Sequence, residues 1–441
     1  MITLLNGIEI CYSTATMLKK EGRYYMDCLI AEKDYIEFEA MLSDDGYYSL
    51  VIEHASDGDS YHNILIDGAY YGGVLCKSAK GHTVTKTCPI YLENGLHKLR
   101  LLRNWGELCF FAMYPEFIKG EKEVHMPKFE LSNPNASKEC RDLIDYFRSI
   151  YGKRIITGQH TDFNRADIAY IKQRTGQTPA MAGFDVMSYS GSTYTDEMKW
   201  ETIRGLSGCK RNIDAAIEWA VESRGLVTLC WHWYSPSKGR DKSFYTANTD
   251  FDLAQALDEK AEDYKLILRD LDLIAEQLKR LRDKDISVLW RPLHEADGGW
   301  FWWGAKGAKA FKELYRLMYD RFTVMHGLNN LIWVLTAPTE DWYPGDDVVD
   351  LNTIDVYAPE ANPGPLCLEY EKVRGVRNNK PVGLGEIGTV PDLYTIMKES
   401  PWLWFMIWYG FSYEEQHNKP ENLRKFMNAP AALNLEEFAA R

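Results

Sequence analysis

The sequence lacks several patterns that would assign it to common classes of protein. Its nine cysteines are scattered and form no C-x-x-C pair, which argues against a cysteine-bound metal or a redox centre. No apolar run is long enough to span a bilayer, so no membrane partner is expected. No basic stripe is present, and the formal net charge of −13 disfavours nucleic acid as a partner. These absences leave a globular protein with a ligand of another kind.

The first residues also lack the pattern of a secretory signal peptide, a basic segment followed by a long apolar stretch. Two locations therefore stay open. The protein is cytoplasmic if this start is native, and it is secreted if a signal peptide has been removed. The cysteines fit either a reducing compartment or a secreted protein that leaves its thiols free.

What the sequence has in excess is aromatic side chains. The 441 residues include 14 Trp and 27 Tyr, and aromatic residues make up 13% of the chain. This excess favours recognition of a flat ligand. The hydrophobic share of 45% is ample for packed cores, and the length predicts two domains.

The N-terminal part of the chain, over residues 1–120, reads as an all-β sandwich. Short alternating segments such as Y-I-E-F-E-A and Y-Y-S-L-V-I-E-H are separated by Asp-Gly and Asn-Gly turns. That spacing is typical of antiparallel strands in a small sandwich. A charged segment with Pro and Asn follows and predicts a linker over residues 121–137.

Residues 138–441 show strands alternating with helices, which predicts an α/β fold. Helices are expected at Asn212 to Ser223, Leu253 to Lys284 and Ala305 to Met325. Eight strand-like runs over this length favour one (β/α)8 (TIM) barrel over a doubly wound sheet. The unit between the fifth and sixth strands is short and poorly helical. The eight runs are R-I-I-T-G-Q, P-A-M-A-G-F-D, G-L-V-T-L-C-W-H, I-S-V-L-W-R-P, L-I-W-V-L-T, L-N-T-I-D-V-Y, P-V-G-L-G-E and W-F-M-I-W-Y.

The most informative segment is W-R-P-L-H-E-A-D-G-G-W-F-W-W-G, which runs from Trp290 to Gly304. It places Glu295 beside a histidine and follows them with four consecutive aromatic residues. Aromatic faces stack on the apolar C–H surfaces of pyranose rings, so the segment indicates a sugar-cleaving site. The alternative is an aromatic cluster under a surface loop, with Glu295 as an ordinary solvated acid. Within this segment we expect sugar contacts from His294, Trp300, Phe301 and Trp303.

Polar or aromatic residues follow six of the predicted strands. In a barrel of this kind, reactive residues lie just past the carboxyl ends of the strands. A single histidine in such a place is more often structural, but their convergence predicts an active site. These residues are His160, His232, His294, Glu295, Asp355, Tyr357, Glu386 and Trp408.

Two of these residues form a carboxylate pair of the kind that glycoside cleavage needs. Glu295 lies beside apolar rings, which favour a neutral acid. Glu386 lies among small residues in G-L-G-E-I-G, and a hydrogen bond from Tyr357 would hold it as the ionised nucleophile. An alternative reading of Glu386 is a buried acid paired with Arg291, and that pairing is compatible with catalysis.

These motifs together resemble glycoside hydrolase family 26. The resemblance rests on R-P-L-H-E with G-x-W-F-W-W-G, on G-Q-H and W-H upstream, and on D-V-Y and G-E-I-G downstream; it covers residue 138 to the C-terminus. It implies a retaining β-1,4-mannanase in which Glu295 is the acid/base and Glu386 the nucleophile, without a metal or organic cofactor. It also implies substrate contacts from His294, His232, Trp300, Tyr357 and Trp408. The loops after the second and eighth strands match no known pattern, so subsite number and endo or exo attack stay open.

The N-terminal sandwich resembles a carbohydrate-binding module of family 35 or family 6. The cues are Y-I-E-F-E, N-I-L-I-D-G and L-E-N-G-L-H-K-L-R-L-L, which precedes Trp105. The resemblance implies that Trp105 stacks on sugar and that a structural calcium is present, with ligands that stay unassigned. The alternative is that Trp105 is a core residue at a strand end.

Three other functions compete with a mannanase. Enzymes of the same family act on mixed-linkage β-glucan or β-1,3-xylan, and the catalytic residues do not distinguish them. A sugar-binding protein with a decayed active site is the third alternative, and the presence of Glu295 and Glu386 with their supporting residues argues against it. The expected partner is β-mannan polysaccharide or oligosaccharide, and the expected state is a monomer.

Overall fold

The chain folds into two compact units. The computed structural model describes residues 9–13, 16–20, 23–119, 126–193, 198–337, 339–359, 362, 364–376 and 380–441. Unit 1 comprises Met1–His125, Ala358–Glu371 and Pro391–Ser400, and unit 2 comprises Met126–Tyr357, Lys372–Val390 and Pro401–Arg441. Of the predicted linker, residues 121–125 lie outside the described part of the chain.

Unit 1 contains two antiparallel sheets, as the alternating sequence pattern predicts. One sheet has the strand order β1-β4-β10-β6-β7; the other has the order β2-β3-β11-β5-β8, with β9 paired to β5. Burial alternates along β4, because every second side chain faces the core. The strands are β1 (Glu9–Ser13), β2 (Thr16–Lys20), β3 (Arg23–Leu29), β4 (Tyr35–Leu42), β5 (Gly46–Ser56), β6 (Ser60–Ile66), β7 (Ala69–Cys76), β8 (Ala79–Lys86), β9 (Ile90–Leu92), β10 (Gly95–Trp105) and β11 (Leu108–Ile118).

The core of unit 1 includes residues from far along the sequence. Cys367 and Leu368 pack in the same apolar cluster as the inward side chains of the sandwich strands. The next residue, Glu369, is buried, and its carboxylate accepts hydrogen bonds from the Tyr61 and Tyr70 hydroxyls. The backbone N–H of Gly73 donates a third bond of 3.0 Å. Three donors compensate for the burial of this carboxylate, so the later segment is an integral part of unit 1.

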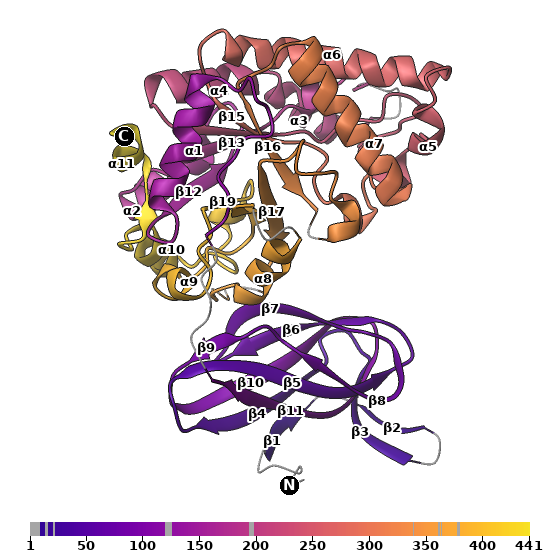
Figure 1. Ribbon diagram of the computed structural model, residues 1–441, viewed down its shortest axis with the longest axis vertical. Helices are drawn as coiled ribbons and strands as arrows, with labels where there is room; N and C mark the ends of the chain where they lie inside the picture. Colours follow the sequence, from indigo (N-terminus) through magenta and orange to yellow (C-terminus); the bar gives the residue numbers. More distant parts are fainter. Residues whose placement is uncertain are drawn as a thin grey trace. The chain divides into compact units, whose positions relative to one another are not determined.

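Unit 2 is a closed barrel of eight parallel strands, as predicted, with each strand paired to the next and β12 paired to both β13 and β19. Each of the eight predicted runs overlaps one of the eight barrel strands. Helices such as α1, α4, α6 and α7 lie around the strands (Figure 1). The barrel strands are β12 (Ile155–His160), β13 (Met181–Asp185), β14 (Leu226–Cys230), β15 (Val288–Arg291), β16 (Leu331–Thr336), β17 (Leu351–Val356), β18 (Val382–Ile387) and β19 (Trp404–Ile407), and β20 (Ala432–Leu433) adds to β12.

The helices differ from the prediction at two places. The single helix expected from Leu253 to Lys284 is two helices, because the side chain of Asp258 accepts from the N–H of Lys260 and forms a turn there. The helix expected to reach Met325 ends in a π-helical turn over Arg321–Met325. The helices are α1 (Lys138–Ile150), α2 (Ala166–Thr175), α3 (Trp200–Cys209), α4 (Asn212–Glu222), α5 (Leu253–Ala256), α6 (Glu262–Arg282), α7 (Gly307–Asp320), α8 (Cys367–Gly375), α9 (Leu393–Glu399), α10 (Pro420–Met427) and α11 (Leu435–Ala439).

Two further points concern the connection between β16 and β17 and the helices as a whole. Between β16 and β17, the described residues contain a short 3-10 turn at Glu340–Trp342 and no α-helix, as the poorly helical sequence predicts. None of the helices in the described part of the chain has the length and apolar content that crossing a membrane requires.

A buried carboxylate, Asp350, stabilises the start of the barrel strand β17. Its side chain accepts from the backbone N–H of Trp333, at 2.7 Å, and from that of Ser132. We expect Asp350→Ala to lower the free energy of unfolding by about 2–5 kcal/mol, because two buried N–H groups lose their acceptor. Denaturant unfolding of the full chain measures this change. Asp142→Ala, which removes an exposed acid on α1, is the matched control, and an equal effect of the two variants would contradict the assignment.

Candidate active site

The predicted site residues lie where the barrel strands end. His160 is the last residue of β12, and His232 follows β14 by two residues. His294 and Glu295 follow β15, and Glu386 lies near the end of β18. All of these strands are parallel, so their carboxyl ends meet at one end of the barrel.

Glu295 sits on a tightly constrained turn. Leu293 and Glu295 both have left-handed backbone conformations, with φ of 51° and 54°. This conformation is costly for side chains larger than glycine, and it persists only where surrounding contacts hold it. Here the N–H of Glu295 donates to the Thr336 carbonyl at 3.1 Å, and the Trp303 indole donates to the His294 carbonyl at 2.9 Å. These bonds fix the direction in which Glu295 leaves the backbone.

Glu386 is a buried carboxylate with two strong donors. The Tyr357 hydroxyl donates to Oε2 at 2.6 Å, which is the hydrogen bond predicted from the sequence. Arg291 donates from Nη2 to Oε1 in a buried ion pair, so the alternative reading of Glu386 also describes a real contact. The ion pair and the hydroxyl donor hold both carboxylate oxygens in place, as a nucleophile requires.

Asp355 forms an ion pair with the other terminal nitrogen, Nη1, of the same guanidinium. Nη1 of Arg291 lies 2.9 Å from Oδ2 of Asp355, and both side chains are almost fully buried. A Cβ atom on Gly385 would collide with this carboxylate, which explains a glycine directly before Glu386. The observed role of Asp355 is therefore to bind Arg291, and the substrate contact expected from the sequence stays a prediction.

The carboxylates lie close enough to act on one bond. Glu295, Glu386 and Asp355 each offer a carboxylate oxygen, and these atoms lie within 4.8 Å of one another. Retaining glycosidases hold their two carboxyl groups about 5–5.5 Å apart, whereas inverting ones hold them about 6.5–9.5 Å apart. The spacing between Glu295 and Glu386 therefore fits a retaining reaction.

The electrostatic environment separates the two glutamates. Burial raises the pKa of Glu295, and the nearby negative charge of Glu386 raises it further. The Trp300 indole, whose Nε1 donates to Oε2 of Glu295 at 2.9 Å, opposes this rise because it stabilises the carboxylate. Glu295 is thus suited to carry a proton.

The aromatic residues after β15 divide into exposed and buried members. Trp300 is 49% exposed and can offer a face to a ligand, whereas Trp303 is fully buried. Trp303 exposes no surface for the substrate contact predicted from the sequence: its ring packs on Phe301 at 4.6 Å, and its N–H donates within the turn. Phe301 is also buried and supports Tyr245, a half-exposed ring stacked on it at 5.5 Å.

The histidines pack in the same site. The His160 ring lies 4.3 Å from that of Trp408, and burial lowers the pKa of His160 to about 4. Burial likewise lowers the pKa of His294. Burial has the same tendency at His232, but the charge and hydrogen bond of Asp185, together with the charge of Glu386, outweigh it and raise the pKa of His232.

Asp185 is the site residue that the sequence analysis missed. It ends β13, and its Oδ2 lies 2.5 Å from Nδ1 of His232. The rule that found the other residues, a polar side chain at the end of a buried strand, applies to Asp185 as well. Tyr245 was also missed, since it lies in a long loop without a recognisable spacing from a strand.

Two groups of side chains in the described part of the chain could be considered as metal ligands: Asp185 with Cys230 and His232, and Glu295 with Asp355 and Glu386. Neither fits well. The 2.5 Å between Asp185 and His232 is a hydrogen-bond distance, and two ligands of a tetrahedral ion about 2.1 Å away stand further apart. In the second group, the Arg291 guanidinium already supplies the positive charge.

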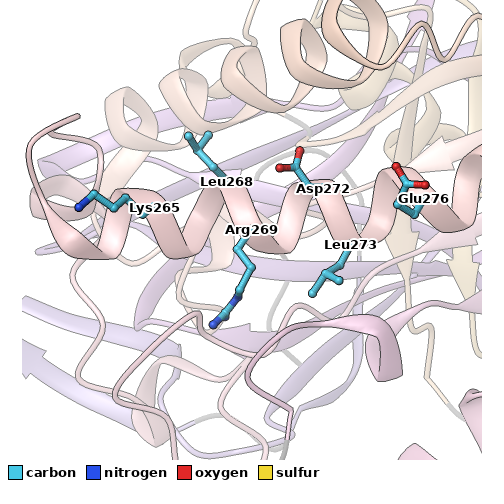
Figure 2. A pocket seen from close by; sticks show the side chains of 6 residues that line it. All are labelled: Lys265, Leu268, Arg269, Asp272, Leu273 and Glu276. Carbon is cyan, nitrogen blue, oxygen red and sulfur yellow. The ribbon is translucent and has the colours of Figure 1, made fainter.

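A surface groove elsewhere on unit 2 has none of these residues. It follows helix α6, and its lining side chains all project from that helix (Figure 2). Lys265, Arg269, Asp272 and Glu276 give it mixed charge. None of them lies in the cluster around Glu295 and Glu386.

Comparison with known proteins identifies the family. The family model described as Glycosyl hydrolase family 26 matches residues 132–437. The chain belongs to glycosyl hydrolase family 26. It is therefore a glycoside hydrolase, as the motifs around Glu295 and Glu386 predict, and retention of configuration is general for this family.

Several members of family 26 resemble the chain over most of its length. A mannan endo-1,4-beta-mannosidase of Thermothelomyces thermophilus is 38% identical over 432 residues, which cover 95% of this chain and 86% of the relative. The crystal structure of the Podospora anserina GH26-CBM35 β-(1,4)-mannanase is 33% identical, with a TM-score of 0.68, and the match covers 98% of this chain and 96% of that one. A β-mannanase from a symbiotic protist of the termite Reticulitermes speratus, complexed with gluco-manno-oligosaccharide, is 32% identical with a TM-score of 0.65; the match covers 72% of this chain and 99% of that one.

The hydrogen bond from Trp300 to Glu295 makes a prediction about pH. The indole stabilises the ionised form of Glu295, so Trp300→Phe should raise the pKa of this family 26 acid further. The alkaline limb of kcat/KM, where the acid loses its proton, should then move to higher pH. Hydrolysis of mannohexaose, whose leaving sugar needs a proton, measures the limb across a pH series. Trp302→Phe removes an indole donor that serves the Trp233 carbonyl instead, and a similar displacement in that control would contradict the explanation.

Proposed function

We propose that this chain is an endo-acting β-1,4-mannanase that cleaves mannan, glucomannan or galactomannan by double displacement. The observation that carries the proposal is the pair formed by Glu295 and Glu386. Their oxygens lie within 4.8 Å, the pKa of Glu295 is raised, and Glu386 is paired with Arg291. The substrate follows from the relatives, since those from Thermothelomyces thermophilus and Piromyces sp are both mannan endo-1,4-beta-mannosidases.

In the first step Glu386 attacks the anomeric carbon. The C–O bond to the leaving sugar breaks, and its oxygen takes the proton of Glu295, so that a glycosyl-enzyme ester forms. Arg291 and Tyr357 hold the Glu386 carboxylate in place before the attack. The Trp300 indole holds Glu295 and eases its ionisation as the proton leaves.

In the second step Glu295, now ionised, removes a proton from water. The resulting hydroxide attacks the anomeric carbon, the ester bond to Glu386 breaks, and the product retains its configuration. The chemistry uses only groups of this chain, with no cofactor in either step. Burial of the cluster keeps these charges in a low-dielectric environment, which strengthens their interactions.

Product analysis tests the substrate and the mode of attack. We expect mannohexaose and glucomannan to give a spread of oligosaccharides on chromatography, and the first product seen by NMR to be the β anomer. Lichenan and xylan should give little product. Mannobiose as the sole product would indicate exo attack, and release from lichenan alone would overturn the choice of substrate.

The same assay tests the two roles. Glu386→Ala should lower kcat by at least about 10⁴-fold, because no covalent intermediate forms. Glu295→Ala should lower kcat/KM about 10²–10⁴-fold on polysaccharide, with a smaller loss of kcat/KM on an activated aryl glycoside, whose leaving group needs no proton donor. Glu313→Ala, an exposed acid on α7, is the control. Appreciable turnover of the aryl glycoside by Glu386→Ala would refute its role as the nucleophile.

We also propose that the sandwich of unit 1 binds carbohydrate, with Trp105 as a stacking residue. Trp105 is 48% exposed at the end of β10, and its ring lies parallel to that of Tyr61 at 6.3 Å. The similar Podospora anserina enzyme is described as a GH26-CBM35 protein. A structural calcium in this unit and a monomeric state remain part of the proposal.

The full chain is the right material for a test of Trp105, because residues 358–371 and 391–400 belong to unit 1. We expect Trp105→Ala, in a Glu386→Ala background, to migrate faster than the parent in a native gel containing soluble mannan. Phe117→Ala removes a similarly exposed ring from β11 and should leave migration unchanged. Equal retardation of the parent and the Trp105 variant would leave the sandwich without a sugar-binding role for this residue.

A further inference from the structure

Asp185 is a buried carboxylate with no task in the two steps above. It is 3% exposed at the end of β13. Its Oδ1 accepts from the backbone N–H groups of Met187, at 2.8 Å, and His232, at 3.2 Å. Its Oδ2 faces Nδ1 of the His232 ring at 2.5 Å. The carboxylate thus binds both the backbone and the side chain of His232.

These contacts determine where His232 carries its proton. A carboxylate can only accept, so Nδ1 of His232 must be the donor. In the neutral imidazole the other nitrogen, Nε2, is then an acceptor. That nitrogen lies 3.3 Å from Nε2 of His294. One proton lies between the two rings, and it must come from His294.

The surroundings of His294 agree with this assignment. Its Nδ1 is buried and has no hydrogen-bond partner among the described residues. A proton on Nδ1 would therefore bury an unsatisfied N–H, which is unfavourable. Nε2 of His294 also lies 3.9 Å from Oε1 of Glu386. A proton on Nε2 thus lies on the side of the ring that faces the nucleophile.

We propose that Asp185 is a positioning residue that fixes the proton of His232 on Nδ1. Because Nε2 of His232 then accepts, His294 must carry its own proton on Nε2, next to the Glu386 carboxylate. The effect of this arrangement on turnover rests on the proposed function, whereas the positions of the protons are independent of it.

Asparagine at position 185 would exchange the protonated and unprotonated nitrogens of His232 and of His294. Its carbonyl oxygen must accept from the two backbone N–H groups that now donate to Oδ1, because the amide nitrogen cannot accept from them. The NH₂ group then faces Nδ1 of His232, which must become an acceptor. His232 would carry its proton on Nε2 and would donate to His294. The proton of His294 would move to the nitrogen that has no partner.

Other charged groups act on His232 from the strands around it. Asp185 and Glu386 favour the protonated ring, whereas Arg291 disfavours it, and His160 lies in the same cluster. A doubly protonated His232 would donate from both nitrogens and would hide the effect of Asp185. The pKa of His232 is raised, so the proton positions are compared across a pH series that extends well above the ordinary pKa of histidine.

The experiment is Asp185→Asn in the full chain, with two readouts. Long-range ¹H–¹⁵N correlation spectra of protein labelled with [¹⁵N]histidine report which ring nitrogen carries the proton, and spectra of His232→Gln and His294→Gln assign the signals. We expect Nδ1–H on His232 and Nε2–H on His294 in the wild type, and Nε2–H on His232 in the variant. Hydrolysis of mannan should show kcat lowered about 10–100-fold, with a smaller change in KM.

Asp350→Asn is the matched control, because Asp350 is a buried carboxylate that accepts from two backbone N–H groups but contacts no histidine. It should lower stability and leave kcat and the histidine signals unchanged. An unchanged kcat in Asp185→Asn would overturn the proposal, and so would a proton on Nε2 of His232 in the wild type. The wild-type spectra decide even if the variant fails to fold. If the wild type does not cleave mannan, the proposed function fails, whereas the spectra still test the proton order.

Discussion

The buried guanidinium of Arg291 is the interaction on which the site depends. It comes from β15 and pairs with Asp355 on β17 and Glu386 on β18. Without it, two buried carboxylates on adjacent strands would face each other unpaired, which is strongly destabilising. Burial and the nearby charge of Glu386 raise the pKa of Glu295, whereas the charge of Arg291 opposes that rise. One cation thus holds Glu386 in place and acts on the charge of Glu295.

The remaining constraints are geometric, and they come from rigid elements. Barrel strands carry Glu386 and its ion-pair partner Arg291, whereas Glu295 lies on a turn with left-handed residues. The buried Trp303 anchors that turn through the His294 carbonyl. The aromatic run after β15 therefore has two separate functions: Trp303 supports the backbone from within, and Trp300 contacts the acid at the surface.

Much of this arrangement could be predicted, because buried parallel strands are apolar runs and their ends are where polar residues gather. The hydrogen bond between Tyr357 and Glu386 followed from their places on neighbouring strands. The break before α6 could not be predicted, since the apolar period continues while a local bond of Asp258 ends the helix. A run of aromatic residues in the sequence also does not show which ring, such as that of Trp303, points inward. Such choices depend on contacts between distant parts of the chain.

The late segment within unit 1 has a consequence for synthesis. Cys367 and Leu368 belong to the core of a sandwich whose last strand ends at Ile118, roughly 250 residues earlier. At about 5–20 residues per second, the ribosome delivers them roughly 12–50 s after that strand. During this interval the Tyr61 and Tyr70 hydroxyls have no carboxylate to receive their hydrogen bonds. Part of the apolar interior of the nascent sandwich therefore stays uncovered until Cys367 and Leu368 have been synthesised.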